Sequence, residues 1–140
     1  DGLSELLQRS PSVPIAIDES LVDLEPAMLR ELPAVAAVIL KPTLLGLERS
    51  MAFARAATAI GATPVVTSMF ESGVGLSVLA QFAASITPAE LAVGLDTRAW
   101  LAEDLLNGEL YAAPGLIRLS QLDDFEARLV TDRLQEVKCD

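Results

Sequence analysis

Four short apolar runs recur along the chain at similar intervals. Each run is apolar throughout rather than alternating with polar positions, and together they span residues 13–17, 36–40, 64–67 and 92–95. An apolar run of strand length without alternation is typical of a strand that is buried on both faces of a parallel sheet. The pattern therefore predicts four parallel strands.

The intervals between these runs show the period of a helix. Leu24, Met28, Leu29 and Leu32 form one apolar stripe, and the next interval is rich in alanine and stops at Gly61, a residue suited to a helix end. The pattern predicts helices over residues 22–32, 47–60, 75–85 and 98–107.

A strand followed by a helix is thus predicted four times. The residues directly after the strands are spaced 23, 27 and 28 apart, and they are Asp18, Lys41, Ser68 and Asp96. A repeat of this length fits a βα unit, and right-handed crossovers bring all the strand ends to one rim of the sheet. We predict an α/β fold of parallel (βα) units with these four side chains on a common rim.

The pattern weakens after Gly108. We expect a strand over residues 115–119 and a terminal helix or tail over residues 122–137. Residues 1–107 would then form one portion of repeated βα units, and residues 108–140 an extension of it.

Composition and charge narrow the class of protein. The chain has 140 residues, well short of the roughly 250 of a complete eight-stranded α/β barrel. Its apolar content of 51% and mean hydropathy of +0.42 encode more core surface than a small domain normally hides. The net charge of -10 disfavours a nucleic-acid partner, and the absence of histidine excludes Ser-His-Asp and Cys-His mechanisms.

The termini and the cysteine bear on the compartment. No apolar run reaches the roughly 18 residues that span a bilayer, and residues 1–5 lack the basic flank and apolar centre of a signal peptide. We expect a soluble, cytoplasmic protein without a membrane partner. The single cysteine, Cys139, can form no internal disulfide and is interpreted as a thiol of the tail.

Two candidate chemical groups follow the first two strands. Asp18 is well placed to bind a hard cation such as Mg²⁺ through oxygen, although Asp18, Glu19 and Ser20 also suit the start of a helix. Lys41 follows a buried strand, where a pKa lowered by desolvation would allow it to act as a general base. A salt-bridged loop lysine is the alternative.

The ends of the third and fourth strands carry weaker signals. Residues 68–75 resemble a helix entry whose backbone N–H groups could hold a substrate carboxylate, but a well-capped helix explains them equally well. Residues 94–97 form a short acidic turn that taken alone is only another helix start.

The order of these motifs resembles the enolase superfamily, in the branch that holds muconate-lactonising enzymes and o-succinylbenzoate synthases. The motifs are residues 18–20, 41–43, 71–76 and 94–97, and residues 39–46 look most like o-succinylbenzoate synthases. The resemblance covers the chain up to about residue 107. It implies the C-terminal half of the catalytic barrel of a TIM-type fold.

The resemblance also implies roles for individual residues. Asp18 would be one of three carboxylate ligands of an essential Mg²⁺, with Mn²⁺ as a possible substitute, and Glu19 would lie behind it near Lys41. Lys41 would be one of two lysines that flank the substrate, here the cation on the face opposite the base. The residues implied to contact a small carboxylate substrate are Ser68, Glu71, Ser72, Gly73, Gly94 and Asp96.

The implied reaction is the dehydration of a cyclohexadiene carboxylate to o-succinylbenzoate, a step of menaquinone or phylloquinone synthesis. The resemblance places the other lysine and two metal carboxylates on strands before Asp18, so we expect the chain alone to be inactive. A second copy or a preceding half would cover the open barrel. The alternatives are a related racemase, epimerase or muconate cycloisomerase, and a non-catalytic half-barrel fragment.

Overall fold

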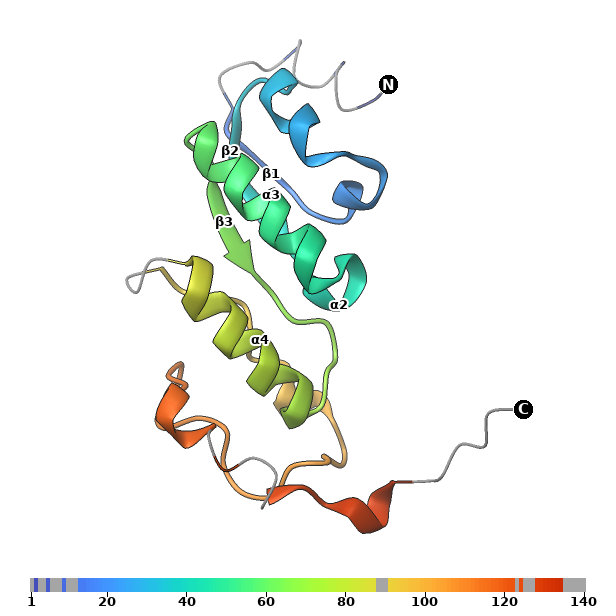
Figure 1. The fold of residues 1–140 in the computed structure, drawn as a ribbon, viewed down its shortest axis with the longest axis vertical. Helices are drawn as coiled ribbons and strands as arrows, with labels where there is room; N and C mark the ends of the chain where they lie inside the picture. Colours follow the sequence, from blue (N-terminus) through green and yellow to red (C-terminus); the bar gives the residue numbers. More distant parts are fainter. Residues whose placement is uncertain are drawn as a thin grey trace, which may run out of the picture.

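The computed structural model describes residues 2, 5, 9, 13–87, 91–122, 124 and 128–134. The molecule is elongated, with the sheet and helix α3 (Leu47–Ala59) at one end and helix α4 (Gly73–Ile86) with the later segments at the other (Figure 1). Among these described residues, no helix is long and apolar enough to cross a membrane.

Three parallel strands form the sheet. They are β1 (Ile15–Ile17), β2 (Val35–Leu40) and β3 (Thr63–Val66), and they lie in the order β1-β2-β3. The predicted strand at 92–95 is reduced to one parallel bridge, between Thr67 and Gly94. The prediction of an α/β fold with parallel βα units is therefore confirmed, although its fourth strand contributes a single bridge.

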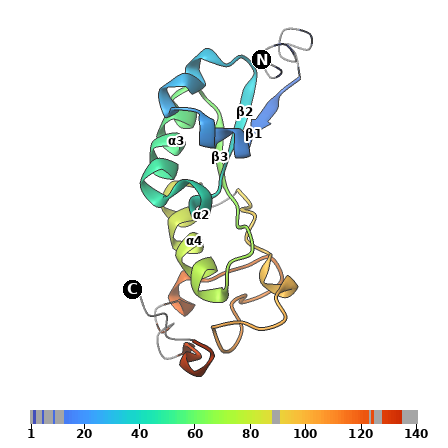
Figure 2. The same ribbon diagram turned by 90° about the vertical axis from the view of Figure 1, so that its right-hand side faces the viewer.

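Helix α3 covers one face of the sheet, and Figure 2 shows the two as adjacent layers. The core between them contains buried side chains of both elements, including Val38, Leu40, Phe53 and Ala57. The other face of the sheet is less covered: Ala16 is exposed, and its partner Ala37 and Ile39 are only partly buried. Burial on both faces, which the unbroken apolar runs predicted, is thus not complete in this chain.

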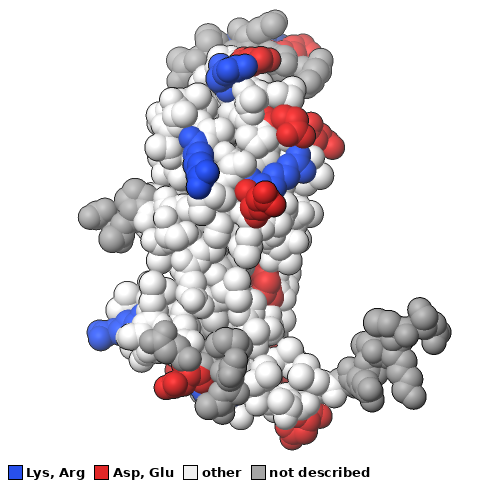
Figure 3. All heavy atoms as spheres, in the orientation of Figure 1, with Lys and Arg blue, Asp and Glu red and all other residues white. Residues whose placement is uncertain are grey.

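Helix α4 organises a second core. Its buried residues, among them Leu76 and Leu79, pack with Val66 of β3 and with Leu106, Leu110 and Leu122 from later segments. Ile86, at the end of α4, contacts both cores. On the face drawn in Figure 3, the centre of the molecule carries few charged side chains.

The helix predicted over residues 22–32 is wrong in type. The chain instead forms two 3-10 helices, η1 (Glu19–Asp23) and η2 (Pro26–Glu31). Glu25 has extended backbone angles, as residues before proline favour, and this separates the two turns. A short helix that the sequence did not indicate, α2 (Pro42–Leu45), follows β2 and ends at Gly46, whose φ of 82° suits glycine.

The helix predicted over residues 98–107 is also wrong. Only the 3-10 turn η3 (Arg98–Trp100) forms, and the backbone of Leu101 is extended. Polar contacts made by Arg98 and Asp104 to other segments replace the regular helix, as described below.

The C-terminal segments are irregular where they are described. Residues 115–119 form no strand; Leu116 makes one antiparallel bridge to Ala113, and η4 (Leu119–Gln121) follows. Within 128–134 the chain forms only the 3-10 turn η6 (Thr131–Arg133), so of the predicted helix or tail over 122–137 this part is not a regular helix. The rest of that prediction, at residues 123, 125–127 and 135–137, lies outside the described residues, as does Cys139.

Candidate active site

Asp18 and Lys41 meet at the carboxyl ends of β1 and β2. Because these strands are parallel neighbours, the residues after them emerge at the same rim. Nζ of Lys41 lies 2.9 Å from each carboxylate oxygen of Asp18 and also donates a hydrogen bond to Oε1 of Glu19. The Lys41 side chain is only 15% exposed, so the ammonium is held between two carboxylates in a partly desolvated place.

These contacts favour the charged form of Lys41. The hydrogen bond to Glu19 raises the pKa of Lys41, and Asp18 adds to this effect, while burial acts in the opposite direction without outweighing them. The hydrogen bond from Lys41 likewise lowers the pKa of Glu19. The expectation of a pKa lowered by desolvation is therefore wrong for Lys41, which the structure favours as a fixed cation.

One carboxylate oxygen of Asp18 is buried beside the Lys41 ammonium. Oδ1 of Asp18 is buried and accepts no hydrogen bond among the described residues, although it lies beside the Lys41 ammonium. Carboxylate oxygen is the donor that Mg²⁺ prefers, so Asp18 fits the part of one ligand. The described residues contain no cluster of three side chains able to hold a metal ion, so they do not make a complete site.

Ser68 ties the end of β3 to the next rim segment. Its hydroxyl donates to the carbonyl of Gly94 at 3.0 Å and shares a hydrogen bond of 2.9 Å with Oγ1 of Thr97. Gly94 has little room for a side chain, since a Cβ there would lie 2.8 Å from Cγ2 of Thr67. In this structure both predicted substrate contacts serve to join two rim segments.

Glu71 is also engaged within the rim. Its carboxylate accepts hydrogen bonds from the hydroxyl of Thr43 and, at 2.8 Å, from the backbone N–H of Met69. A Cβ at Gly75 would lie 2.7 Å from Cβ of Glu71, which explains the glycine at the third position of α4. Glu71 thus connects α2, which follows β2, to the loop that follows β3.

The first turn of α4 holds a carboxylate of the protein itself. The backbone N–H of Gly73 donates to Oδ1 of Asp104 at 2.7 Å, while the preceding Ser72 makes no capping hydrogen bond through its side chain. Arg98 pairs with the same carboxylate and also donates to the carbonyl of Leu106 at 2.8 Å. At Gly73, the position expected to bind a substrate carboxylate is therefore filled by Asp104.

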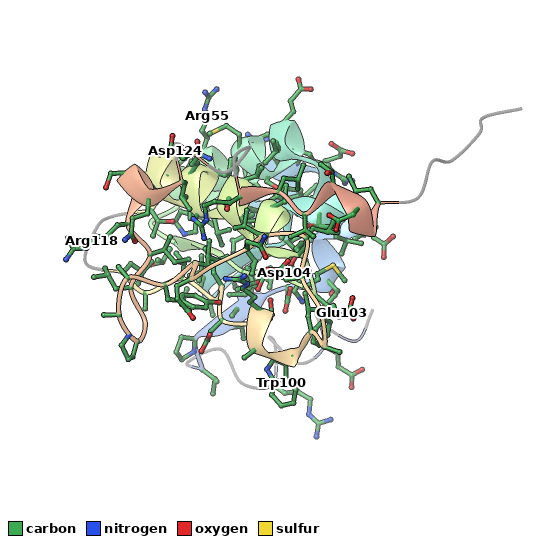
Figure 4. The ribbon with its side chains drawn as sticks, turned by 90° about the horizontal axis from the view of Figure 1, so that it is seen from below. Arg55, Trp100, Glu103, Asp104, Arg118 and Asp124 are labelled. Atoms are coloured by element: carbon green, nitrogen blue, oxygen red, sulfur yellow. The ribbon has the colours of Figure 1, made fainter. Side chains whose placement is uncertain are left out.

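Sequence reasoning missed Arg98 and Asp104. Both were assigned to a helix, and only their opposite charges six residues apart hint at a pair. Hydrogen bonds from Gly73 and Arg98 lower the pKa of Asp104 against the opposing effect of burial. Seen from below, Asp104 is turned toward the body of the molecule, whereas the 78% exposed side chain of Trp100 points away from it (Figure 4).

Asp96 lies apart from this network. It is exposed, and it lines the mouth of a cavity of about 420 Å³ between α4 and residues 111–119. The hydroxyl of Tyr111 donates to the carbonyl of Leu95 at 2.9 Å; burial, and then the charge of Asp96, raise the pKa of this tyrosine. The structure thus brings Asp18, Glu19 and Lys41 together and gives Asp96 a different setting.

The sequence of this chain is similar to those of known proteins. No family model matches the chain. The chloroplastic protein PHYLLO of Arabidopsis thaliana is 32% identical over 146 residues, which cover 90% of this chain and 8% of that protein. An o-succinylbenzoate synthase of Escherichia coli is 43% identical over 95 residues, 67% of this chain and 29% of the relative. The chain thus spans less than a third of the length of either relative.

The fold of this chain is similar to parts of solved structures of enzymes. A mandelate racemase/muconate lactonizing enzyme from Roseiflexus sp. matches 88% of this chain and 34% of its own, with a TM-score of 0.71 and 30% identity. A dipeptide epimerase from Methylococcus capsulatus, solved with Mg and a dipeptide, matches 81% of this chain and 39% of its own, with a TM-score of 0.60 and 25% identity.

Proposed function

Because the chain belongs to the enolase superfamily, we propose that it is the part of an o-succinylbenzoate synthase that supplies the cationic side of the active site. The observation that carries this proposal is the Lys41 ammonium held between Asp18 and Glu19 at adjoining strand ends. The 43% identity to the Escherichia coli enzyme supports the choice of reaction within the superfamily.

The role of Lys41 follows from its charge. Removal of a proton next to a carboxylate leaves a dianionic enediolate, and a cation fixed beside it lowers the free energy of that species more than that of the substrate. Asp18 and Glu19 keep the ammonium protonated and in place, so Lys41 acts as an electrostatic partner and not as the base. The base would be the second lysine, which the family resemblance assigns to a strand before Asp18.

A divalent metal would be the second source of positive charge. Bound Mg²⁺ supplies Lewis-acid stabilisation of the developing negative charge. Asp18, with its buried Oδ1, would give one of the ligands, and the resemblance assigns the others to strands before Asp18. This division agrees with the absence of a three-residue metal cluster among the described residues. Turnover would therefore need those strands as well as this chain.

Two other functions have specific support. The likeness to a dipeptide epimerase favours a reaction that uses the same proton abstraction but returns the proton to carbon. A non-catalytic half barrel is favoured because the described residues contain no group of three side chains able to hold a metal ion. The two are separated by whether any carbon-bound proton of a carboxylate substrate exchanges with solvent.

The test is an assay for o-succinylbenzoate from the cyclohexadiene carboxylate, with the protein that carries this chain at its native length and with the 140-residue chain alone. We expect Mg²⁺-dependent product from the longer protein, with Lys41→Ala at least about 100-fold slower, and none from the isolated chain. The control is Arg55→Ala, which removes an exposed cation of α3. A Lys41→Ala variant as fast as the control would refute the role of Lys41.

If the longer protein instead exchanges substrate protons with solvent without losing water, the epimerase alternative holds. Dehydration by the 140-residue chain well above its own Lys41→Ala variant would refute the view that this chain holds only part of the site.

A further inference from the structure

We infer that Arg49 is a positioning residue that sets Asp18 and Glu19 opposite Lys41, an inference that rests on the proposed function of this ion pair. Arg49 lies on α3, away from the rim contacts of Lys41. Its Nη2 donates to three backbone carbonyls, those of Leu21 at 3.4 Å, Val22 at 3.1 Å and Leu24 at 2.6 Å.

These carbonyls mark the end of η1. The last carbonyls of a helix lack partners within it and carry partial negative charge, so a guanidinium group there is favourable. η1 begins directly after Asp18, and the N–H of Leu21 donates to the carbonyl of Asp18 at 2.9 Å. A five-residue turn therefore links the Arg49 contact to the two carboxylates that hold Lys41.

Arg49 is itself well anchored. Its guanidinium carbon lies 5.6 Å from the ring centre of Phe53, which is fully buried one turn further along α3. An oxygen of Glu25 lies 3.9 Å from Nη2 on the far side of η1. The group that contacts η1 therefore extends from a helix whose buried side chains, including Phe53, belong to the core.

The Arg49 contact joins two consecutive parts of the chain. Lys41, α2 and α3 form one continuous unit, whereas Asp18, Glu19 and η1 form the unit before it. The two units touch at the Asp18–Lys41 ion pair and again at the Arg49 contact. With Leu21 buried in the core, the ion pair before η1 and the Arg49 contact at its end hold η1 on both sides.

The geometry is specific to arginine. The planar guanidinium can contact a phenyl ring and several carbonyls at once, whereas a lysine ammonium is more strongly hydrated and lacks the flat face. Lysine at this position would keep the charge and lose part of the contact. Methionine would keep much of the apolar stem and lose all the donors.

The experiment measures how Lys41 reacts with an amine-modifying reagent at fixed pH, by mass spectrometry of the protein that carries this chain. We expect Arg49→Met to raise the labelling of Lys41 several-fold, and Arg49→Lys to raise it less. Two variants on the same helix serve as controls, Arg55→Met, which removes an exposed cation, and Ala57→Gly, which weakens α3 without touching the contact.

The inference is overturned if Lys41 in Arg49→Met reacts no faster than in Ala57→Gly, because the effect would then be general destabilisation. A second readout is turnover at native length, where Arg49→Met should lower kcat several-fold with KM little changed. If labelling responds while the native protein forms no o-succinylbenzoate, the positioning by Arg49 stands and the proposed function fails. If the labelling of Lys41 is unchanged in Arg49→Met while the native protein forms o-succinylbenzoate at the normal rate, the positioning by Arg49 fails and the proposed function stands.

Discussion

The backbone N–H of Gly73 and the carboxylate of Asp104 lie 2.7 Å apart, which joins the first turn of α4 to a residue 31 positions later. Arg98 completes the contact, and both charged side chains are largely buried, with 15% and 13% exposure. Breaking one partner of such a pair leaves the other uncompensated. This network therefore holds the segments after residue 97 against α4.

Replacing Asp104 should destabilise the molecule strongly. In Asp104→Ala, Arg98 loses its carboxylate partner and the N–H of Gly73 loses its acceptor, and we expect the free energy of unfolding to fall by about 2–3 kcal/mol. Urea unfolding followed by circular dichroism measures it. Asp132→Ala, at an exposed acid of η6, serves as the control and should change stability by less than about 0.5 kcal/mol. Equal losses in the two variants would contradict the network.

The same carboxylate should make stability depend on acid pH. The folded pKa of Asp104 lies below its ordinary value of 3.8, so its contribution is present above that value and is lost as the pH falls through the folded pKa. The difference in unfolding free energy between the protein and Asp104→Asn should therefore shrink below about pH 4. Denaturant unfolding at several pH values tests this. A difference that stays constant down to pH 2 would contradict the assignment.

Lys41 should show the opposite dependence. Its folded pKa is raised, mainly by Glu19, so the stability it contributes is fully present below its ordinary pKa and is lost as the pH rises through the folded pKa. The advantage of the protein over Lys41→Met should persist at neutral pH and disappear only at strongly alkaline pH. Thermal melts across that range provide the measurement, with Arg55→Met as the control for loss of an exposed cation. Loss of the advantage already near pH 8 would indicate a lowered pKa instead.

Magnesium should have a modest effect on the 140-residue chain. If Asp18 supplies one carboxylate ligand, as proposed, we expect weak binding, and millimolar Mg²⁺ should stabilise the fold by less than about 0.5 kcal/mol. In the protein at native length, removal of the metal should lower stability and Asp18→Asn should abolish that response. Thermal shift with and without a chelator checks both. A large Mg²⁺ response of the isolated chain would mean that its own residues complete the site.

Much of the site could be predicted because it depends on local pattern and chain direction. Unbroken apolar runs indicated parallel strands, and parallel neighbours must end at the same rim, so the closeness of Asp18 and Lys41 followed from the sequence. The α3 and α4 helices followed from their period and from glycines near their ends. The division of the chain at residue 107, and the substrate contacts assigned to Ser68, Glu71 and Gly73, stay predictions.

The tertiary structure decided what periodicity cannot encode. The apolar stripe before β2 forms two 3-10 turns, and Pro26 lies where the second begins. Residues 98–107 do not form the predicted helix; Asp104 instead contacts Gly73 and Arg98. The pKa of Lys41 rose instead of falling because two carboxylates outweigh its burial, a balance that depends on distances in space. The apolar pattern was enough to place Asp18 and Lys41 at adjoining strand ends. Their hydrogen-bond partners and the direction of the Lys41 pKa shift could be known only from the fold, because they depend on contacts between segments far apart in the sequence.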